Sequence, residues 1–209
     1  AHAITASPDH RFLVTANQEG TATLWETAAA RVAGRLVPRP GKQGTRPDSI
    51  QAVAFATPHL AGKPYQLATG DSRGGLRIWQ IDAAQNVQQW RVSWEGDSPV
   101  KGISALAWHD QRLVVGTIGG AVYLFDNPKV NAAEPDSERI LKLDASQPVA
   151  SKSSDTTQGV TALVFDPSGQ YLAVARESSA QASVPQTRLR IYELERDRQG
   201  KTTLVLFRG

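Results

Sequence analysis

The chain has 209 residues with 23 Lys or Arg against 20 Asp or Glu, so its formal net charge is only +3. Hydrophobic residues make up 40% and charged residues 21%, as in ordinary globular domains, and the small charge excludes the dense single-sign surface typical of nucleic-acid binders. Cysteine is absent, which excludes a disulfide framework and cysteine-ligated metals, and no apolar run approaches the roughly 18 residues of a membrane span.

The first segment of the chain sets a pattern that the rest repeats. An apolar run, "AITA", leads through the turn "SPDH" to a second run, "FLVTA". A glycine-containing turn, "NQEG", then precedes the alternating run "TATLWE", and a weaker run, "RVAGRLV", follows. Short alternating runs separated by such turns predict four antiparallel β-strands.

Three further segments carry the same pattern in the same order. They read "SIQAVAF…YQLATGDSRGGLRIWQ", "GISALAWHDQRLVVGTIGGAVYLFD" and "GVTALVFDPSGQYLAVARE…RLRIYE", each followed by a weaker run. The third strand of every copy ends in an aromatic residue, and these four occupy one structural position: Trp25, Trp79, Phe125 and Tyr192.

Four antiparallel strands repeated about every 50 residues describe an all-β protein, a β-propeller with four consecutive four-stranded antiparallel blades. We expect these blades at residues 1–37, 49–93, 102–143 and 159–207. The Ala-rich stretches are too short for stable helices.

The repeats resemble those of the WD-repeat family. The pattern V-x-A-V-A-F-S-P-D-G, then L-A-T-G, then D-G-T-V-R-I-W-D is matched at Val53, Phe55, 67–70 and 76–79. It is matched again at 165–169, Leu172 and 189–192. The family's Gly-His pair is missing from every copy. Its turn Asp is replaced by Glu19, Arg73 and Gly119 and has no counterpart in the fourth, so its usual side-chain network is not expected. The third copy also fits a quinoprotein-type repeat.

The stretch "GDSRGG" at 70–75 looks like the segment around a trypsin-like nucleophile. Its position matches the turns "NQEG" and "TIGG", and a nucleophilic serine would also need a histidine base and a carboxylate. The inserted Arg73 breaks the spacing of the protease motif. We therefore expect Ser72 to be a turn residue.

Four blades are fewer than the about seven that WD-type rings usually need. The chain contains no methionine, even at position 1, and its first strand appears shortened against the fourth copy. We expect residues 1–209 to be part of a larger, seven-bladed ring, with the remaining blades supplied by the same protein or by another chain.

Candidate partner-binding residues come from one basic strip and one aromatic residue. Inserts at 38–49, 94–101, 144–158 and 177–186 gather at one end of the predicted blades, where loops on a rigid scaffold commonly bind partners. The basic strip runs from Arg31 to Arg46, and the sequence has no acidic residue between Glu26 and Asp48. The predicted residues are Arg31, Arg35, Arg39, Lys42, Arg46 and Trp94. Free solvated loops are the alternative.

No catalytic, cofactor or metal site is predicted. The histidines at 2, 10, 59 and 109 fall in different repeats without metal-ligand spacing. "GKQGT" lacks the spacing of a phosphate loop, and the basic strip lacks the aromatics of a single-strand binder, so nucleic acid is not an expected partner.

The sequence thus predicts a non-catalytic, cytoplasmic protein–protein interaction module that recognises a protein or regulates an attached activity. The resemblance implies such a role because WD-type propellers often serve in signalling and scaffold proteins, and the residue usage is compatible with a bacterial source. The alternative is a quinoprotein- or hydrolase-like propeller enzyme with its site at the central channel.

Overall fold

The described part of the chain folds into four antiparallel sheets. The computed structural model describes residues 2–38, 48–57, 62–82, 84–92, 102–126, 140–143, 159–177, 187–196 and 202–206. These residues hold strands but no helix of the length and apolarity that would cross a membrane.

Each sheet contains four strands that are consecutive in the chain and paired in sequence order. We call the sheets blades 1 to 4. Blade 1 holds β1 (Ala3–Ala6), β2 (Phe12–Ala16), β3 (Ala22–Glu26) and β4 (Arg31–Leu36). Blade 2 holds β5 (Ile50–Phe55), β6 (Tyr65–Asp71), β7 (Leu76–Ile81) and β8 (Val87–Val92). Blade 3 holds β9 (Ile103–His109), β10 (Arg112–Thr117), β11 (Val122–Asp126) and β12 (Ile140–Leu143). Blade 4 holds β13 (Val160–Phe165), β14 (Tyr171–Glu177), β15 (Thr187–Arg196) and β16 (Thr202–Leu206).

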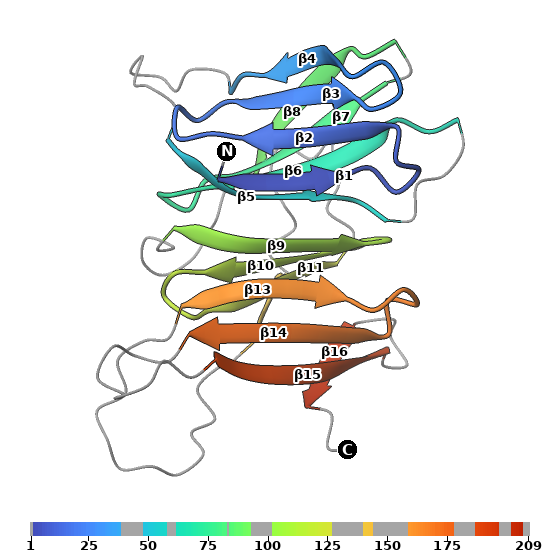
Figure 1. The fold of residues 1–209 in the computed structure, drawn as a ribbon. Helices are drawn as coiled ribbons and strands as arrows, with labels where there is room; N and C mark the ends of the chain where they lie inside the picture. The colour runs from blue at the N-terminus through green and yellow to red at the C-terminus, as the bar shows by residue number, and fades with distance from the viewer. Residues whose placement is uncertain are drawn as a thin grey trace.

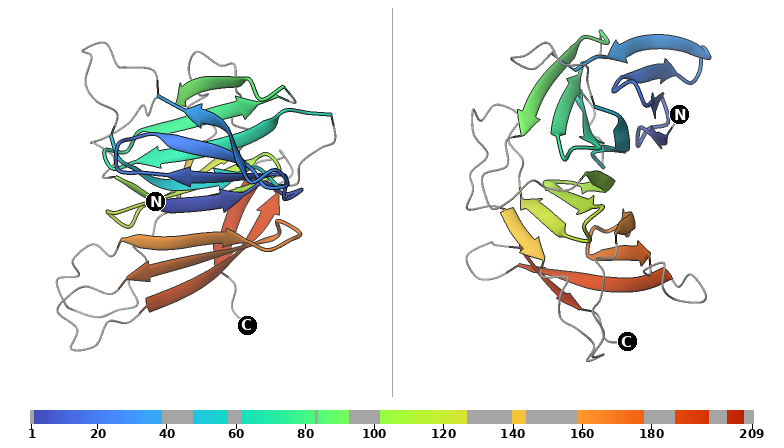
Figure 2. Two further views of the ribbon diagram at one scale, coloured as in Figure 1. Left: turned by 45° about the horizontal axis from the view of Figure 1, so that its top comes forward. Right: turned by 90° about the vertical axis from the view of Figure 1, so that its left-hand side faces the viewer.

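The four blades fan out from their first strands. The first strands β1, β5, β9 and β13 are neighbours in that order (Figure 1), and the blades follow one another along an arc (Figure 2). The prediction of an all-β propeller of consecutive four-stranded antiparallel blades is confirmed. The limits of the predicted domain, residues 1–209, and the number of blades in a complete ring stay predictions.

Every pair of neighbouring blades buries a hydrophobic core between them. We call the side of a blade that packs against the blade before it the preceding face, and the other side the following face. At the first junction the following face of blade 1 contributes Leu24, and the preceding face of blade 2 contributes Leu67 and Trp79. The other two junctions repeat this arrangement, with aliphatic residues on the following face.

Glycine lets the blades approach each other closely beside the first strands. A Cβ added to Gly70 would collide with the side chain of Ile103, and one added to Gly116 would collide with that of Val160. Ile103 and Val160 begin the first strands of blades 3 and 4. A missing side chain on one blade therefore makes room for a β-branched residue on the next.

The first turns of blades 1 and 4 use the same two residue types in opposite order. In blade 1, Ser7 accepts the N–H of the next strand's first residue and its hydroxyl donates to Asp9. In blade 4, Asp166 accepts the corresponding N–H and the hydroxyl of Ser168. These bonds hold the pKa of Asp166 at about 2. They cap the turn backbone, as such side chains commonly do.

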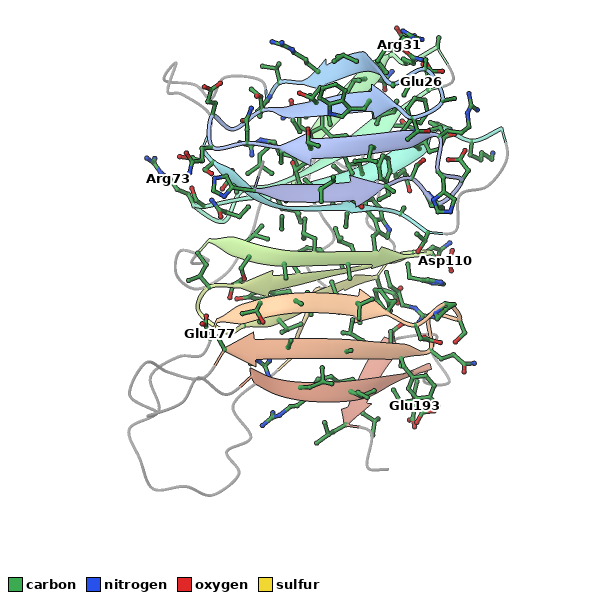
Figure 3. All side chains as sticks on the ribbon, in the orientation of Figure 1. Glu26, Arg31, Arg73, Asp110, Glu177 and Glu193 are labelled. Atoms are coloured by element: carbon green, nitrogen blue, oxygen red, sulfur yellow. The ribbon has the colours of Figure 1, made fainter. Side chains whose placement is uncertain are left out.

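The two turns of a blade lie at opposite ends of the sheet. Figure 3 shows Asp110 of a first turn at one end, whereas Arg73, in a second turn, and Glu177 lie at the other. The expectation that second turns and blade-to-blade connections share an end agrees with the ion pair between Arg73 and Asp48, which precedes β5.

The two blades that carry Trp at the end of the third strand also provide a hydroxyl acceptor for its indole N–H. Trp79 donates to the Thr69 hydroxyl at 2.9 Å, and Trp25 donates to that of Thr15 at 3.0 Å. Strand register places Val115 at this position in blade 3 and Val174 in blade 4, where the aromatic is Phe or Tyr. The hydroxyl is thus present where a donor must be satisfied.

We predict that Thr69→Val lowers the free energy of unfolding by about 1–2 kcal/mol, because it leaves the buried indole N–H of Trp79 without an acceptor while preserving side-chain shape. Thr69→Ser is the matched control, since it keeps the oxygen. Urea unfolding followed by circular dichroism measures both. Equal losses in the two variants would contradict the role of the hydroxyl.

Candidate interaction surface

The first strands surround a hollow of about 580 Å³ at the centre of the arc. Its wall is mostly apolar and comes from all four blades, and its polar side chains are Thr5, Thr57, His109 and Asp166. Aliphatic and small side chains thus form most of the surface that a molecule in the hollow would meet.

The polar groups beside the hollow are already engaged in holding turns. The hydroxyl of Thr57 donates to the carbonyl of Trp108 at 3.0 Å. One ring nitrogen of His109 lies 3.3 Å from the carbonyl of Pro167, and its ring lies 5.8 Å from that of Phe165. Among the described residues, no group of three or more His, Asp or Glu could hold a metal ion. These contacts give the polar groups a structural role.

Blade 1 leaves its preceding face open to solvent. The indole of Trp25 is 37% exposed, whereas that of Trp79, at the same position in blade 2, is 1% exposed because blade 1 covers it. Ile4 and Val32 are exposed as well, and register places them on the same face as Trp25. This face therefore presents to solvent the kind of apolar surface that elsewhere lies in a core.

Blade 4 leaves its following face open in the same way. Leu189 is 63% exposed, whereas Leu76, at the same position in blade 2, is fully buried. Ile191 is likewise exposed and Ile78 buried. Residues at equivalent positions are thus buried at the internal junctions and exposed on these two faces, which makes both faces candidate interaction surfaces.

The structure describes only two of the six predicted partner-binding residues. Arg31 and Arg35 lie on β4, the outermost strand of blade 1, and both are exposed. Arg31 pairs with Glu26 at 2.5 Å (Figure 3), so part of its charge is neutralised. Arg35 stands opposite Thr23 on the open preceding face. The remaining four, Arg39, Lys42, Arg46 and Trp94, lie outside the described residues.

The "GDSRGG" segment forms the second turn of blade 2, as expected. Gly74 has a φ of 88°, in the left-handed region that glycine adopts readily. The N–H of Ser72 donates to the carbonyl of Ser49 at 2.9 Å. Ser72 is thus a turn residue that connects the turn to the start of its own blade.

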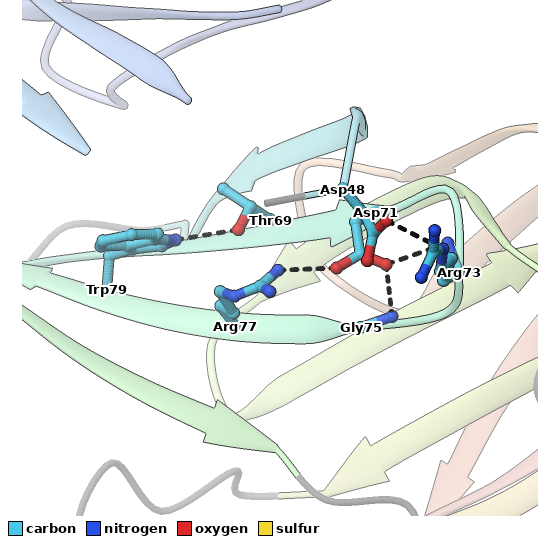
Figure 4. Close-up of polar contacts among 7 residues, drawn as sticks. All are labelled: Asp48, Thr69, Asp71, Arg73, Gly75, Arg77 and Trp79. Atoms are coloured by element: carbon cyan, nitrogen blue, oxygen red, sulfur yellow. Dashed lines mark hydrogen bonds and ion pairs between the residues drawn. The ribbon is translucent and has the colours of Figure 1, made fainter. Parts of the chain in front are cut away.

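A charge network that the sequence patterns did not reveal lies beside this turn (Figure 4). One carboxylate oxygen of Asp71 accepts the N–H groups of Arg73 and Gly75 at 3.0 and 2.7 Å. The other accepts from the Arg77 guanidinium at 2.7 Å, and the exposed fractions of the side chains are 2% for Asp71 and 11% for Arg77. A side chain at Gly75 would collide with this carboxylate.

Asp71 supplies the carboxylate beside this turn, whereas the family pattern has its Asp within the turn. That pattern places its Asp where this chain has Arg73, so the carboxylate appeared to be missing. The available signal was a charged residue, Arg77, between the apolar Leu76 and Ile78 of a strand. An Arg on a buried face calls for a carboxylate nearby.

We predict that Asp71→Asn costs about 3–5 kcal/mol of unfolding free energy, because it leaves the Arg77 charge buried without its partner. Blade 1 has Asn17 and Thr23 at the two equivalent positions. The double variant Asp71→Asn with Arg77→Thr reproduces that uncharged pair, so it should be more stable than Asp71→Asn alone. Chemical unfolding of the three proteins measures this, and additive losses would contradict the coupling.

Comparison with known proteins was made by sequence and by structure. No protein-family model matches the chain, and no curated protein matches its sequence. Among solved structures, the chain is similar to U3-55K (15% identity, TM-score 0.57, covering 97% of this chain and 50% of that one). It is also similar to the RRP9 WD40 repeats (14%, 0.58, 100% and 51%).

A third similar structure is the Cps50 (Swd1) β-propeller domain of Myceliophteria thermophila, at 14% identity and a TM-score of 0.62, covering 98% of this chain and 56% of that one. The chain therefore spans about half the length of these solved structures. At such low identity the likeness establishes the fold alone. The resemblance found in the sequence is confirmed: the chain has the fold of four blades of a WD40-type β-propeller.

Proposed function

We propose that this chain is a non-catalytic interaction module of the cytoplasm whose two open end faces are covered by further four-stranded blades. The module holds a protein partner or regulates an activity attached to it. Support comes from one comparison within the chain: residues at equivalent positions are buried at the internal junctions and exposed at the two ends.

The two open faces are of complementary types. Each internal junction joins a following face of mainly aliphatic residues, with Phe12 added at the first junction, to a preceding face that carries the aromatic residue of its third strand. Blade 4 presents a following face with Leu189 and Ile191, and blade 1 presents a preceding face with Trp25. A further blade of the same design would satisfy each of them in the way that the internal junctions do.

Blade packing also explains why a partner that is not a blade would bind elsewhere. Faces that are covered by blades are not available to a second protein, which leaves the rim and the loop-bearing ends of the sheets. Arg31 and Arg35 are exposed on β4, the outermost strand of blade 1. Arg35 lies at the outer margin of the preceding face, so the proposal requires that the covering blade leaves this margin accessible. We propose that the partner presents an acidic protein surface. The partner-binding residues in this proposal are Arg31, Arg35, Arg39, Lys42, Arg46 and Trp94.

Covering of the blade 1 face can be measured through the hydrogen bond from Trp25 to Thr15. In the full-length protein, we predict that Thr15→Val costs about 1–2 kcal/mol of unfolding free energy, as much as Thr69→Val, because both indole N–H groups are then buried. A solvated Trp25 would find water instead, and the cost would fall below about 0.5 kcal/mol. Denaturant unfolding of both variants distinguishes the cases, and the smaller cost would contradict the covered face.

Partner recognition by the basic strip is tested separately. We predict that Arg35→Glu in the full-length protein reduces recovery of a stoichiometric protein partner, because it reverses a charge on the binding rim. Lys63→Glu is the control, since Lys63 is also exposed but lies near the opposite, first-turn end of blade 2. Quantitative mass spectrometry after affinity purification measures recovery. Equal recovery in the wild type and both variants would count against the strip.

A further inference from the structure

One position at the end of the second strand has the same role in three blades. Asn17 accepts the N–H groups of Glu19 and Thr21, and Asp71 accepts two N–H groups of its own turn. Thr117 accepts the N–H of Ala121 at 3.1 Å. In each case a side-chain oxygen closes the second turn of the blade.

Blade 4 has Arg176 at this position, and a guanidinium cannot accept a hydrogen bond. Arg176 is nevertheless buried, with only 7% of its surface exposed, and its Nε atom is enclosed without a partner. No hydrogen bond or ion pair to Arg176 is found among the residues that the structure describes. Arg112 also has an enclosed Nε without a partner, but another nitrogen of its guanidinium donates to the carbonyl of Gly169 at 2.8 Å.

A second arginine stands on the same face of blade 4. Arg190 lies directly opposite Val174, and Val174 and Arg176 are two residues apart on β14, so all three side chains share the preceding face. Diagonal neighbours of this kind have Cβ atoms within about 7–8 Å, which long side chains can span. The structure records no hydrogen bond or ion pair for Arg190 within its described parts either.

The equivalent positions in blade 2 show what is missing. There, Asp71 and Arg77 form a buried ion pair at 2.7 Å. Blade 4 replaces the Asp with a second cation. Within the described parts of blade 4, Glu193 stands on the opposite face and Glu177, the next residue along β14 (Figure 3), is exposed, so neither carboxylate compensates. Two guanidinium groups on one face, one of them buried, need an anion.

From this geometry we propose that Arg176 and Arg190 bind an oxyanion, a phosphate or carboxylate group, on the preceding face of blade 4 beside its junction with blade 3. The bound oxygens supply the negative charge that the Asp71 carboxylate supplies to Arg77 in blade 2. Arginine suits this task because its planar fork donates two parallel hydrogen bonds to such groups. The site does not depend on the role proposed above for the module.

Isothermal titration of the full-length protein with inorganic phosphate, at constant ionic strength set with sodium chloride, tests the site. We expect the wild type to bind phosphate and Arg176→Met to weaken binding at least about tenfold, since charge-assisted bonds are lost. Arg190→Met should also weaken it and keeps the test decisive if the first variant fails to fold. Arg11→Met is the matched control, because it removes an exposed arginine from the first turn of blade 1, outside the basic strip, and it should bind as the wild type does.

Sodium acetate in place of phosphate distinguishes the two sources of the oxyanion. Tighter binding of phosphate assigns a phosphoryl group to the site, and equal or tighter binding of acetate assigns a carboxylate. No binding of either anion by the wild type would overturn the proposal. Equal phosphate affinity in the wild type, Arg176→Met and Arg190→Met would also overturn it, because binding would then be adventitious.

Discussion

Packing of one blade against the next is the interaction on which the rest of this structure depends. A four-stranded sheet has two faces, and in this chain both are apolar over most of their area. Burial of both faces against neighbouring blades therefore stabilises each sheet. Blades 2 and 3 have two neighbours, whereas blades 1 and 4 have one each, which leaves Trp25 and Leu189 exposed.

The same constraint explains the glycines and the hydroxyls of the sheets. Positions 70 and 116 hold glycine because the first residue of the following blade occupies the space that a side chain would need. Thr69 is polar inside a core because the Trp79 indole, the large side chain of that junction, brings one N–H with it. Each unusual residue thus follows from what the neighbouring blade inserts at the junction.

The four blades differ in the charged residues that they carry at the end of the second strand and at the facing position of the third strand. Blade 2 encloses a complete pair, Asp71 with Arg77, and the same carboxylate also closes a turn. Blade 1 has the neutral residues Asn17 and Thr23 there, and blade 3 has Thr117 and Tyr123. Blade 4 alone among the four carries two cations at these positions, Arg176 and Arg190, which makes its junction a place where a ligand can contribute the absent negative charge.

The fold could be predicted from the sequence because the four-strand pattern is repeated four times. Trp25, Trp79, Phe125 and Tyr192 mark one structural position. Every copy also has a turn glycine with positive φ, namely Gly20, Gly74, Gly120 and Gly169. The family pattern did not predict the turn carboxylate, because it has Asp at the position of Arg73, whereas the carboxylate belongs to Asp71, two residues earlier.

Side-chain partners were the part that sequence could not supply. The interaction of Arg77 with Asp71 depends on strand register, and the burial of Arg176 depends on how blade 4 packs. The basic strip was visible as charge, but Arg31 is paired with Glu26 on the neighbouring strand, which only the sheet pairing reveals. Charge runs along a chain therefore overstate the charge that a surface presents.

Solvent access to Trp25 in the full-length protein tests the central claim most directly. Hydroxyl-radical footprinting read by mass spectrometry reports the modification rate of Trp25 against that of Trp79, which serves as the buried reference in the same molecule. If a further blade covers blade 1, the two indoles should be protected to a similar degree. Modification of Trp25 several times faster than Trp79 would show that the face stays open, and would contradict the account.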